Sequence, residues 1–185
     1  MLPSQKRPHG HPHNTATMVE KKQIVYDLRL HYNGPLVIEE FYKEVEQWMR
    51  EHALHKELKR KEEIIHKDGK QIEWRIEAWK TFDDLHKEVV VLTVLFNDVK
   101  EKKILRKGHT LRFQYGDVLV TLDGWMETTF EGRWTENPLY MILRTLWDKF
   151  VWMFLDPHDG KVSDDCYDLH KRLKAFLELY KIRMA

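Results

Sequence analysis

The alternation of hydrophobic and polar residues predicts a series of strands with helices near both ends of the chain. Apolar side chains occupy every second position from Ile24 to Tyr32, which is typical of a half-buried strand. The run Asn33-Gly34-Pro35 is expected to end this strand, and residues 36–54 then carry apolar side chains at helical spacing. The dipeptide Asp68-Gly69 favours a tight hairpin between two of the later strands. Strand patterns are expected over residues 57–67, 70–80, 89–96, 100–107, 110–122 and 125–134.

Two more helices are predicted after these strands. The first covers residues 139–155, where Asn137 suits the N-cap and Pro138 suits the first helical position. The last is expected to begin at Ser163 and to bury one apolar stripe. The fold class is therefore α+β, with an antiparallel sheet of about six or seven strands and with one N-terminal and two C-terminal helices packed on it.

The chain divides into a polar arm and one domain. Residues 1–22 contain several Pro and Gly residues and few apolar ones, which predicts a flexible arm. Met18 offers a second plausible start of the chain, in which case residues 1–17 would be an extension. Residues 23–185 are expected to form a single α+β domain, since their number suits one core.

The order of these elements resembles the helix-grip arrangement of START and polyketide-cyclase-like domains over residues 23–155. That resemblance implies one alternative function, a small-molecule carrier or cyclase-like domain with a cavity between sheet and helix. The residues that would line such a cavity are Tyr26, Trp74, Trp79, Phe113 and Trp147.

Residues 139–155 are more apolar than a surface helix requires, because thirteen of the seventeen side chains are apolar. Charged side chains interrupt the run, so it is too polar to cross a membrane. We expect one of its faces to form a homodimer or partner interface. The interface candidates are Tyr140, Leu143, Trp147, Phe150, Val151, Trp152 and Phe154.

Composition limits the classes of function. Charged residues make up 33% of the chain and the formal net charge is +1, so no global field drives binding to nucleic acid. The single cysteine excludes an intrachain disulfide framework and a multi-cysteine metal site. Neither a secretory segment nor a membrane-spanning run is recognisable, so a cytoplasmic location without membrane binding is expected.

Candidate catalytic residues are few. Ser4 lies in the arm, Ser163 suits an N-cap, and Cys166 lies one turn into an amphipathic helix, where a small buried side chain is expected. The histidine groups are His9, His11 and His13 in the arm and His52 and His55 after the first helix. The arm histidines could bind nickel, copper or zinc only loosely, because a flexible arm loses conformational entropy on ordering and lacks groups that orient the imidazoles. The pair His52 and His55 needs a third ligand from elsewhere in the chain. We therefore expect no enzymatic activity, no cofactor and no metal.

Local runs of basic residues are the clearest surface signal. One run has a local excess of five positive charges, because Glu101 is its only acidic member. Its members are Lys100, Lys102, Lys103, Arg106, Lys107 and Arg112, with His109 among them, and a second group holds Lys59, Arg60 and Lys61. Such patches suit phosphate contacts, although a solvated surface of a hyperthermophile-like protein explains them at least as well.

In size, composition and organisation the chain resembles the archaeal ribosome dimerisation factors of the Thermococcales. The resemblance implies a homodimer that binds ribosomal RNA or ribosomal protein, tethers two small subunits and prevents joining of the large subunit during hibernation. A dimer with two identical faces suits this task, since it can hold two identical particles. An accessory interaction subunit that does not touch RNA is a third interpretation.

Overall fold

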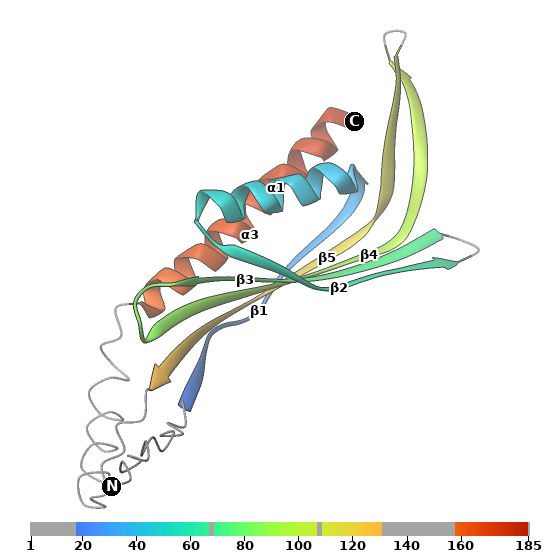
Figure 1. Ribbon diagram of the computed structural model, residues 1–185. Coiled ribbons are helices and arrows are strands. Elements are labelled where there is room, and N and C mark those ends of the chain that lie inside the picture. Colours follow the sequence, from blue (N-terminus) through green and yellow to red (C-terminus); the bar gives the residue numbers. More distant parts are fainter. Residues whose placement is uncertain (1–17, 67–68, 107–108, 131–157, 185) are drawn as a thin grey trace, which may run out of the picture.

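The computed structural model describes residues 18–66, 69–106, 109–130 and 158–184, which form one antiparallel sheet and two helices (Figure 1). The elements in chain order are β1 (Met18–Leu36), α1 (Ile38–Glu51), β2 (His55–His66), β3 (Gly69–Thr81), β4 (His86–Arg106), β5 (His109–Phe130) and α3 (Asp159–Met184). The strand order in the sheet is β1-β5-β4-β3-β2. The α+β class and the antiparallel sheet are confirmed.

The sheet has five strands, so the prediction of six or seven is wrong. The segments 89–96 and 100–107 belong to one strand, β4, and most of 110–122 and 125–134 belongs to β5. Between Asn97 and Lys100 the β4–β5 pairing shifts register, and Asp98 adopts a left-handed conformation with φ 51°. A β-bulge accommodates one extra residue without ending a strand, which explains why this polar run was mistaken for a break.

The prediction that Asn33-Gly34-Pro35 ends the first strand is also wrong. β1 continues to Leu36, and Pro35 pairs with Tyr115 of β5. Because β1 lies at an edge of the sheet, the missing N–H of proline removes no bond that the interior of the sheet needs. β1 also begins at Met18, earlier than the expected strand.

The two helices of the structure match predicted helices, with shifted ends. α1 covers Ile38–Glu51, inside the expected range 36–54. α3 begins at Asp159 rather than at Ser163, because the carbonyl of His158 accepts bonds from the backbone of Lys161 and Val162 at 3.0 and 3.3 Å. The predicted helix over residues 139–155 lies outside the described residues.

Both helices bury their apolar stripes against one face of the sheet. α3 contributes a fully buried row in which Cys166 is a small core residue, as the sequence predicts. Phe41 of α1 contacts Phe96 of β4 edge-on, with ring centroids 5.7 Å apart, and Phe96 contacts Trp74 of β3 at 5.1 Å. The other residues buried in the row on α3 are Val162, Leu169, Leu173, Leu177 and Tyr180.

Gly124 of β5 is a point of close approach between α3 and the sheet. A Cβ at this position would lie 2.8 Å from the Cys166 sulfur and 2.9 Å from Cγ1 of Val162. Only glycine lets the helix pack this closely, so the sheet continues through Gly124 where the sequence suggested a break.

Polar contacts fix the two helices to each other. The Trp48 indole of α1 donates a hydrogen bond of 2.7 Å to the Asp168 carboxylate of α3. Arg172 of α3 donates to Glu44 at 2.6 Å and also pairs with Glu51 at the end of α1. These contacts join the two helices into one layer over the sheet.

One carboxylate lies under this helix layer. Glu88 of β4 is fully buried, and its nearest charged neighbours are Lys80 at 3.1 Å and Asp165 of α3, which binds the same lysine at 2.5 Å. Burial disfavours the charged form and raises the pKa of Glu88 to about 7; the nearby Asp165 charge adds to this, whereas Lys80 opposes it.

In the described part of the chain, neither helix combines the length and the apolar character that a membrane crossing requires.

We predict that Gly124→Ala lowers the free energy of unfolding by about 1–3 kcal/mol, because the added methyl overlaps Cys166 and Val162. Chemical denaturation measures this loss. The double variant with Cys166→Ala should lose less than the two single variants together, since the shared overlap is relieved. Gly160→Ala is the control, because nothing lies within 4 Å of its added Cβ. Additive losses would contradict close packing at Gly124.

We predict that stability falls as the pH rises from about 4.5 to about 7, the window between the ordinary and the raised pKa of Glu88. In this window the folded protein retains a proton that the unfolded chain has lost, so a rise in pH favours unfolding. Glu88→Gln should remove this part of the slope in urea unfolding followed across the window. Glu46→Gln is the control, because Lys56 lowers the pKa of Glu46 and its titration falls below the window. Equal slopes in the wild type and in Glu88→Gln would refute the assignment.

Candidate nucleic-acid interface

The predicted basic run lies on the β4–β5 hairpin, which projects beyond the helix layer (Figure 1). Strand pairing sets Lys100 opposite Tyr115, Lys102 opposite Phe113, and Lys103 opposite Arg112. The four basic residues Lys100, Lys102, Lys103 and Arg112, called the hairpin cluster below, are all exposed. The structure thus brings residues from two separate strands onto one short stretch of hairpin.

At the base of this hairpin the backbones of β4 and β5 approach each other closely. A Cβ at Gly116 of β5 would lie 2.8 Å from the carbonyl oxygen of Asn97, next to the bulge in β4. A bulge increases the local twist of a strand pair. This local geometry turns the distal part of the hairpin away from the core that the helices cover.

The hairpin cluster has no acidic partner among the described residues. No ion pair joins Lys100, Lys103 or Arg112 to another residue of this part of the chain. Lys102 lies over the ring of Tyr115, with its ammonium 4.3 Å from the ring centre. An aromatic face leaves the positive charge available to an anion, so the whole cluster remains electropositive.

Two other predicted residues, Arg106 and His109, pair across the hairpin near its tip through their backbones. Lys107 lies outside the described residues, so the structure bears on the strand positions of the first two only.

The second predicted group lies elsewhere, and two of its three members form ion pairs with glutamates. Lys59, Arg60 and Lys61 belong to the edge strand β2, and the β2–β3 hairpin diverges from the β4–β5 hairpin toward its tip (Figure 1). Lys59 pairs with Glu57 at 2.6 Å and Arg60 with Glu62 at 2.8 Å. Lys61 lies over the Trp74 ring, 5.9 Å from its centre. The two predicted groups therefore do not form one patch.

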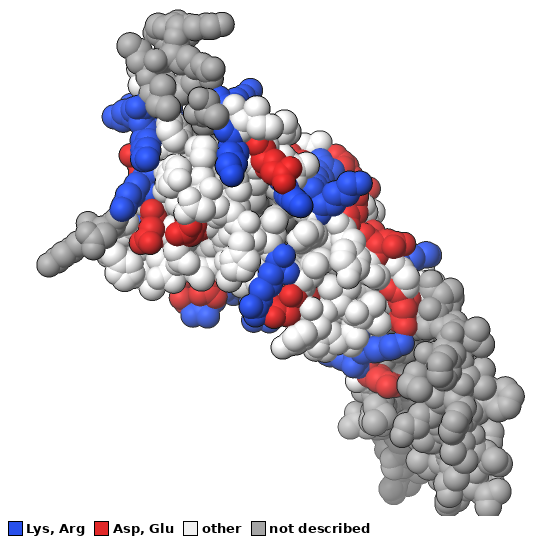
Figure 2. Space-filling view, turned by 180° about the vertical axis from the view of Figure 1, so that it is seen from behind, with Lys and Arg blue, Asp and Glu red and all other residues white. Residues whose placement is uncertain are grey.

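Figure 2 shows how charge is distributed on one face of the molecule. Several Lys and Arg side chains gather at the end that carries the two hairpin tips, next to the residues drawn in grey. Over the rest of this face, acidic and basic side chains lie close to one another. A mixed surface of this kind exerts little long-range attraction on an anion.

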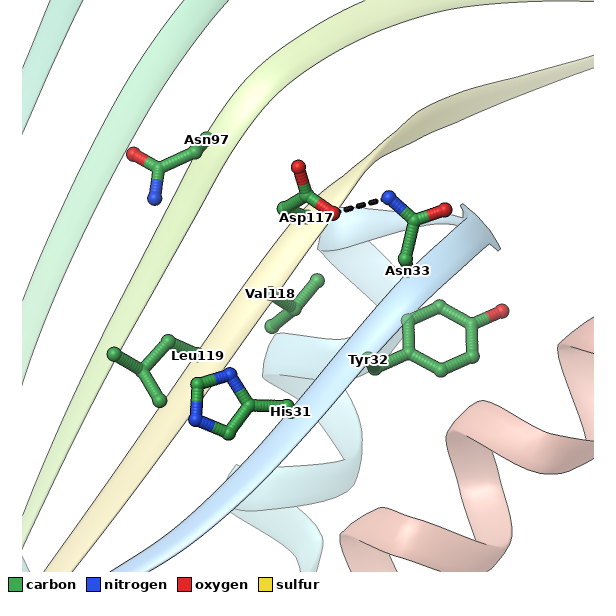
Figure 3. Close-up of a pocket in the computed structure, with 7 residues that line it drawn as sticks. All are labelled: His31, Tyr32, Asn33, Asn97, Asp117, Val118 and Leu119. Atoms are coloured by element: carbon green, nitrogen blue, oxygen red, sulfur yellow. Dashed lines mark hydrogen bonds between the residues drawn. The ribbon is translucent and has the colours of Figure 1, made fainter.

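A groove of about 290 Å³ lies beside the base of the hairpin (Figure 3). Its lining residues are His31, Tyr32, Asn33, Asn97, Asp117, Val118 and Leu119. Figure 3 shows the Asn33 amide and the Asp117 carboxylate joined by a hydrogen bond, with Asn97 and His31 on the neighbouring positions of the groove. The groove thus offers donors and acceptors on a partly apolar floor.

A chain of contacts connects the groove to the hairpin cluster. Asn33 donates to Asp117, and its amide oxygen accepts a bond of 2.9 Å from the Tyr115 hydroxyl. The ring of Tyr115 carries Lys102 on its face. Nearby, Tyr32 donates to the Pro35 carbonyl at 2.7 Å, and burial raises its pKa to about 12.

The described residues that were expected to line a cavity between sheet and helix differ in their surroundings, and Trp79 lies beside His55, with ring centroids 4.6 Å apart. Tyr26 is 78% exposed, whereas Trp74 and Phe113 are buried. Around Trp74 the space under α1 is filled by the contacts of Tyr42 and Phe96 with its ring. Trp147, and all of the predicted dimer-interface residues within 139–155, lie outside the described residues.

Sequence reasoning missed Tyr115, Asn33, Asn97 and Asp117. Each was expected in a strand or a break, without a role in binding. Their association depends on the register that sets Asn33 and Asn97 opposite Asp117 in its two neighbouring strands. The one available signal was the polar run Asn97-Asp98 inside a hydrophobic strand.

The chain matches no protein-family model, no curated protein and no solved structure.

Proposed function

We propose that this protein is a non-enzymatic RNA-binding protein that engages ribosomal RNA through its β4–β5 hairpin. The observation that carries the proposal is the hairpin cluster, which is exposed and joined to no acidic residue in the described part of the chain. Every phosphate that such a cluster contacts releases counterions, which favours binding even at a low net charge of the protein.

The shape of the hairpin favours a polymer over a small anion. Lys100 to Lys103 span about 10 Å of strand, on a projection that exposes them to solvent. A nucleic-acid backbone can contact several of these side chains at once. A single small anion would contact one or two of them.

The groove adds groups suited to the sugar and base of a nucleotide. Asn97, His31 and the pair of Asn33 and Asp117 present amide, imidazole and carboxylate groups. The Asp117 carboxylate repels phosphate, whereas it can accept a bond from a base edge or a ribose 2′-hydroxyl. Phosphates on the hairpin and a base in the groove would therefore select RNA.

The state of the single cysteine supports a role without turnover. Cys166 is fully buried, and burial raises the pKa of its thiol to about 12. A thiol of this kind is not ionised at neutral pH and is not a nucleophile.

The finer part of the proposal is a homodimer that tethers two small ribosomal subunits and so blocks joining of the large one. Its support is the apolar excess of residues 139–155 in the sequence and the symmetry of the task.

We predict that replacing Lys100, Lys102, Lys103 and Arg112 with Ser weakens association with small ribosomal subunits. If all four contact phosphates, the log–log salt slope should shrink by about three, as expected for single-stranded RNA. Co-sedimentation at several salt concentrations measures both quantities, and circular dichroism shows whether the variant is folded.

The matched control for this experiment replaces Lys59 and Arg60 with Ser, which removes basic residues whose charges neighbouring glutamates already neutralise. Its affinity and salt slope should change little. Equal losses of affinity in the two variants, or unchanged binding by the hairpin variant, would contradict RNA binding by the β4–β5 hairpin.

We also predict that the wild type is a dimer at micromolar concentration and that Trp152→Glu makes it monomeric, because an apolar interface does not tolerate a buried unpaired charge. Light scattering measures the mass. In sucrose gradients the wild type should shift small subunits to a faster species, and Trp152→Glu should bind them without this shift. A monomeric wild type would overturn the tethering role and leave RNA binding standing.

A further inference from the structure

Three side chains that commonly bind metals meet at the end of the sheet opposite the hairpin cluster. Asp83 lies in the connection between β3 and β4, His86 begins β4, and His158 immediately precedes α3. One donor atom from each of the three residues can be chosen so that all lie within 4.8 Å of one another. The group joins the sheet to the start of the long C-terminal helix.

The two separations that involve Asp83 are close to those of a small coordination site, and the third, between the imidazoles, is within 4.8 Å. The Nδ1 atom of His86 lies 2.9 Å from each carboxylate oxygen of Asp83, and Nε2 of His158 lies 3.6 Å from Oδ2 of Asp83. In a tetrahedral zinc site with bonds near 2.0 Å, neighbouring donor atoms are about 3.3 Å apart. The two separations bracket this value, so shifts of a few tenths of an ångström would accommodate an ion on these edges.

Backbone N–H groups of the β3–β4 turn hold the Asp83 carboxylate in place. Oδ1 of Asp83 accepts bonds from the backbone N–H groups of Leu85 and His86, both at 2.8 Å. The bond from Leu85, followed by the imidazole of His86, lowers the pKa of Asp83 to about 2. The ligand is therefore ionised at any physiological pH, with Oδ2 left to face His158.

Both imidazoles are also positioned by their surroundings. His86 is 6% exposed. His158 stacks on Phe82, with ring centres 4.8 Å apart and planes 11° from parallel. Positioned rings of this kind lose little conformational freedom when they bind a metal.

We propose that Asp83, His86 and His158 bind a zinc ion that fastens the start of α3 to the β3–β4 turn. Two imidazole nitrogens and one carboxylate oxygen form a donor set that zinc accepts, and a water molecule completes the tetrahedron. The ion takes the place of the proton between His86 Nδ1 and Asp83, and the neutral imidazole then carries its N–H on Nε2.

The choice of zinc follows from the donor types. Imidazole donors favour zinc, copper, nickel or iron over magnesium and calcium, which prefer sites made of oxygen atoms. Zinc also imposes no geometry through its d-electrons, so it fits a site whose edges differ in length. The positive end of helix α3 disfavours a cation, and the Asp83 carboxylate together with Asp159 in the first helical turn offsets this field.

The role that follows is structural. His86 and His158 are far apart in the chain, so one ion can bind both of them only when the sheet and α3 are folded together. An ion that binds the folded state alone stabilises it in proportion to the logarithm of its concentration above the dissociation constant. The expectation of a metal-free protein, drawn from sequence spacing, could not register a site assembled from two distant segments.

The test uses the full-length chain in which His9, His11 and His13 are replaced with Asn, so that the histidines of the arm do not bind added metal. After treatment with a chelator and dialysis, zinc is added in competition with a chromophoric zinc indicator. We expect one zinc per chain and a higher midpoint of thermal unfolding in its presence. Addition of magnesium should not raise the midpoint.

Asp83→Asn and His158→Gln should each lower zinc affinity at least about 100-fold and should abolish the thermal shift. Asp83→Asn retains a side-chain oxygen for the Leu85 and His86 backbone groups, so the turn is expected to form. The control is His66→Gln on the exposed strand β2. This variant should bind zinc as tightly as the parent protein, which is the chain with the three Asn replacements in the arm. Absence of zinc binding by the parent, or equal binding by the parent and both ligand variants, would overturn the proposal.

Discussion

The close approach of α3 to the sheet at Gly124 is the constraint on which the rest of the structure depends. The row of buried side chains on α3 reaches β1, β5 and β4 only because no Cβ separates the helix from β5 at this point. Once α3 is set, Trp48 and Asp168 hold α1 beside it. Two helices then cover the central part of one face, and the ends of the long strands project beyond them.

This arrangement explains why the two ends of the sheet differ in chemistry. At one end, the β3–β4 turn meets the first turn of α3, and ionisable groups such as Asp83 and Glu88 gather around the helix start. At the other end, β4 and β5 continue without a helix over them, so their side chains must be compatible with solvent. The run from Lys100 to Lys103 meets this requirement, and the same solvent exposure makes it available to a large anion.

Much of the fold follows from the sequence because periodicity reports burial on one face. The amphipathic pattern of α1, the apolar stripe of α3 and the pairing of β2 with β3 all lie where the pattern indicates. The strand count does not follow, because the polar runs at Asn97-Asp98 and Asp123-Gly124 resemble turns. Their real roles depend on neighbours distant in the chain: a bulge against β5 in one case, and the packing of Cys166 and Val162 in the other.

The candidate interface likewise depends on neighbours that the sequence does not reveal, in this case the partners of its charged side chains. The sequence identifies both basic runs, yet only cross-strand register and side-chain pairing separate them. Lys59 and Arg60 lie among glutamates of their own strand and of β3, which satisfy their charge. The corresponding neighbours of the hairpin cluster are Tyr115, Phe113 and one another. A surface charge attracts a partner only to the extent that its own protein leaves it unsatisfied. The groove at Asp117 is connected to the hairpin by side-chain contacts. Asn33 binds both the Asp117 carboxylate and the Tyr115 hydroxyl, and the ring of Tyr115 lies against Lys102.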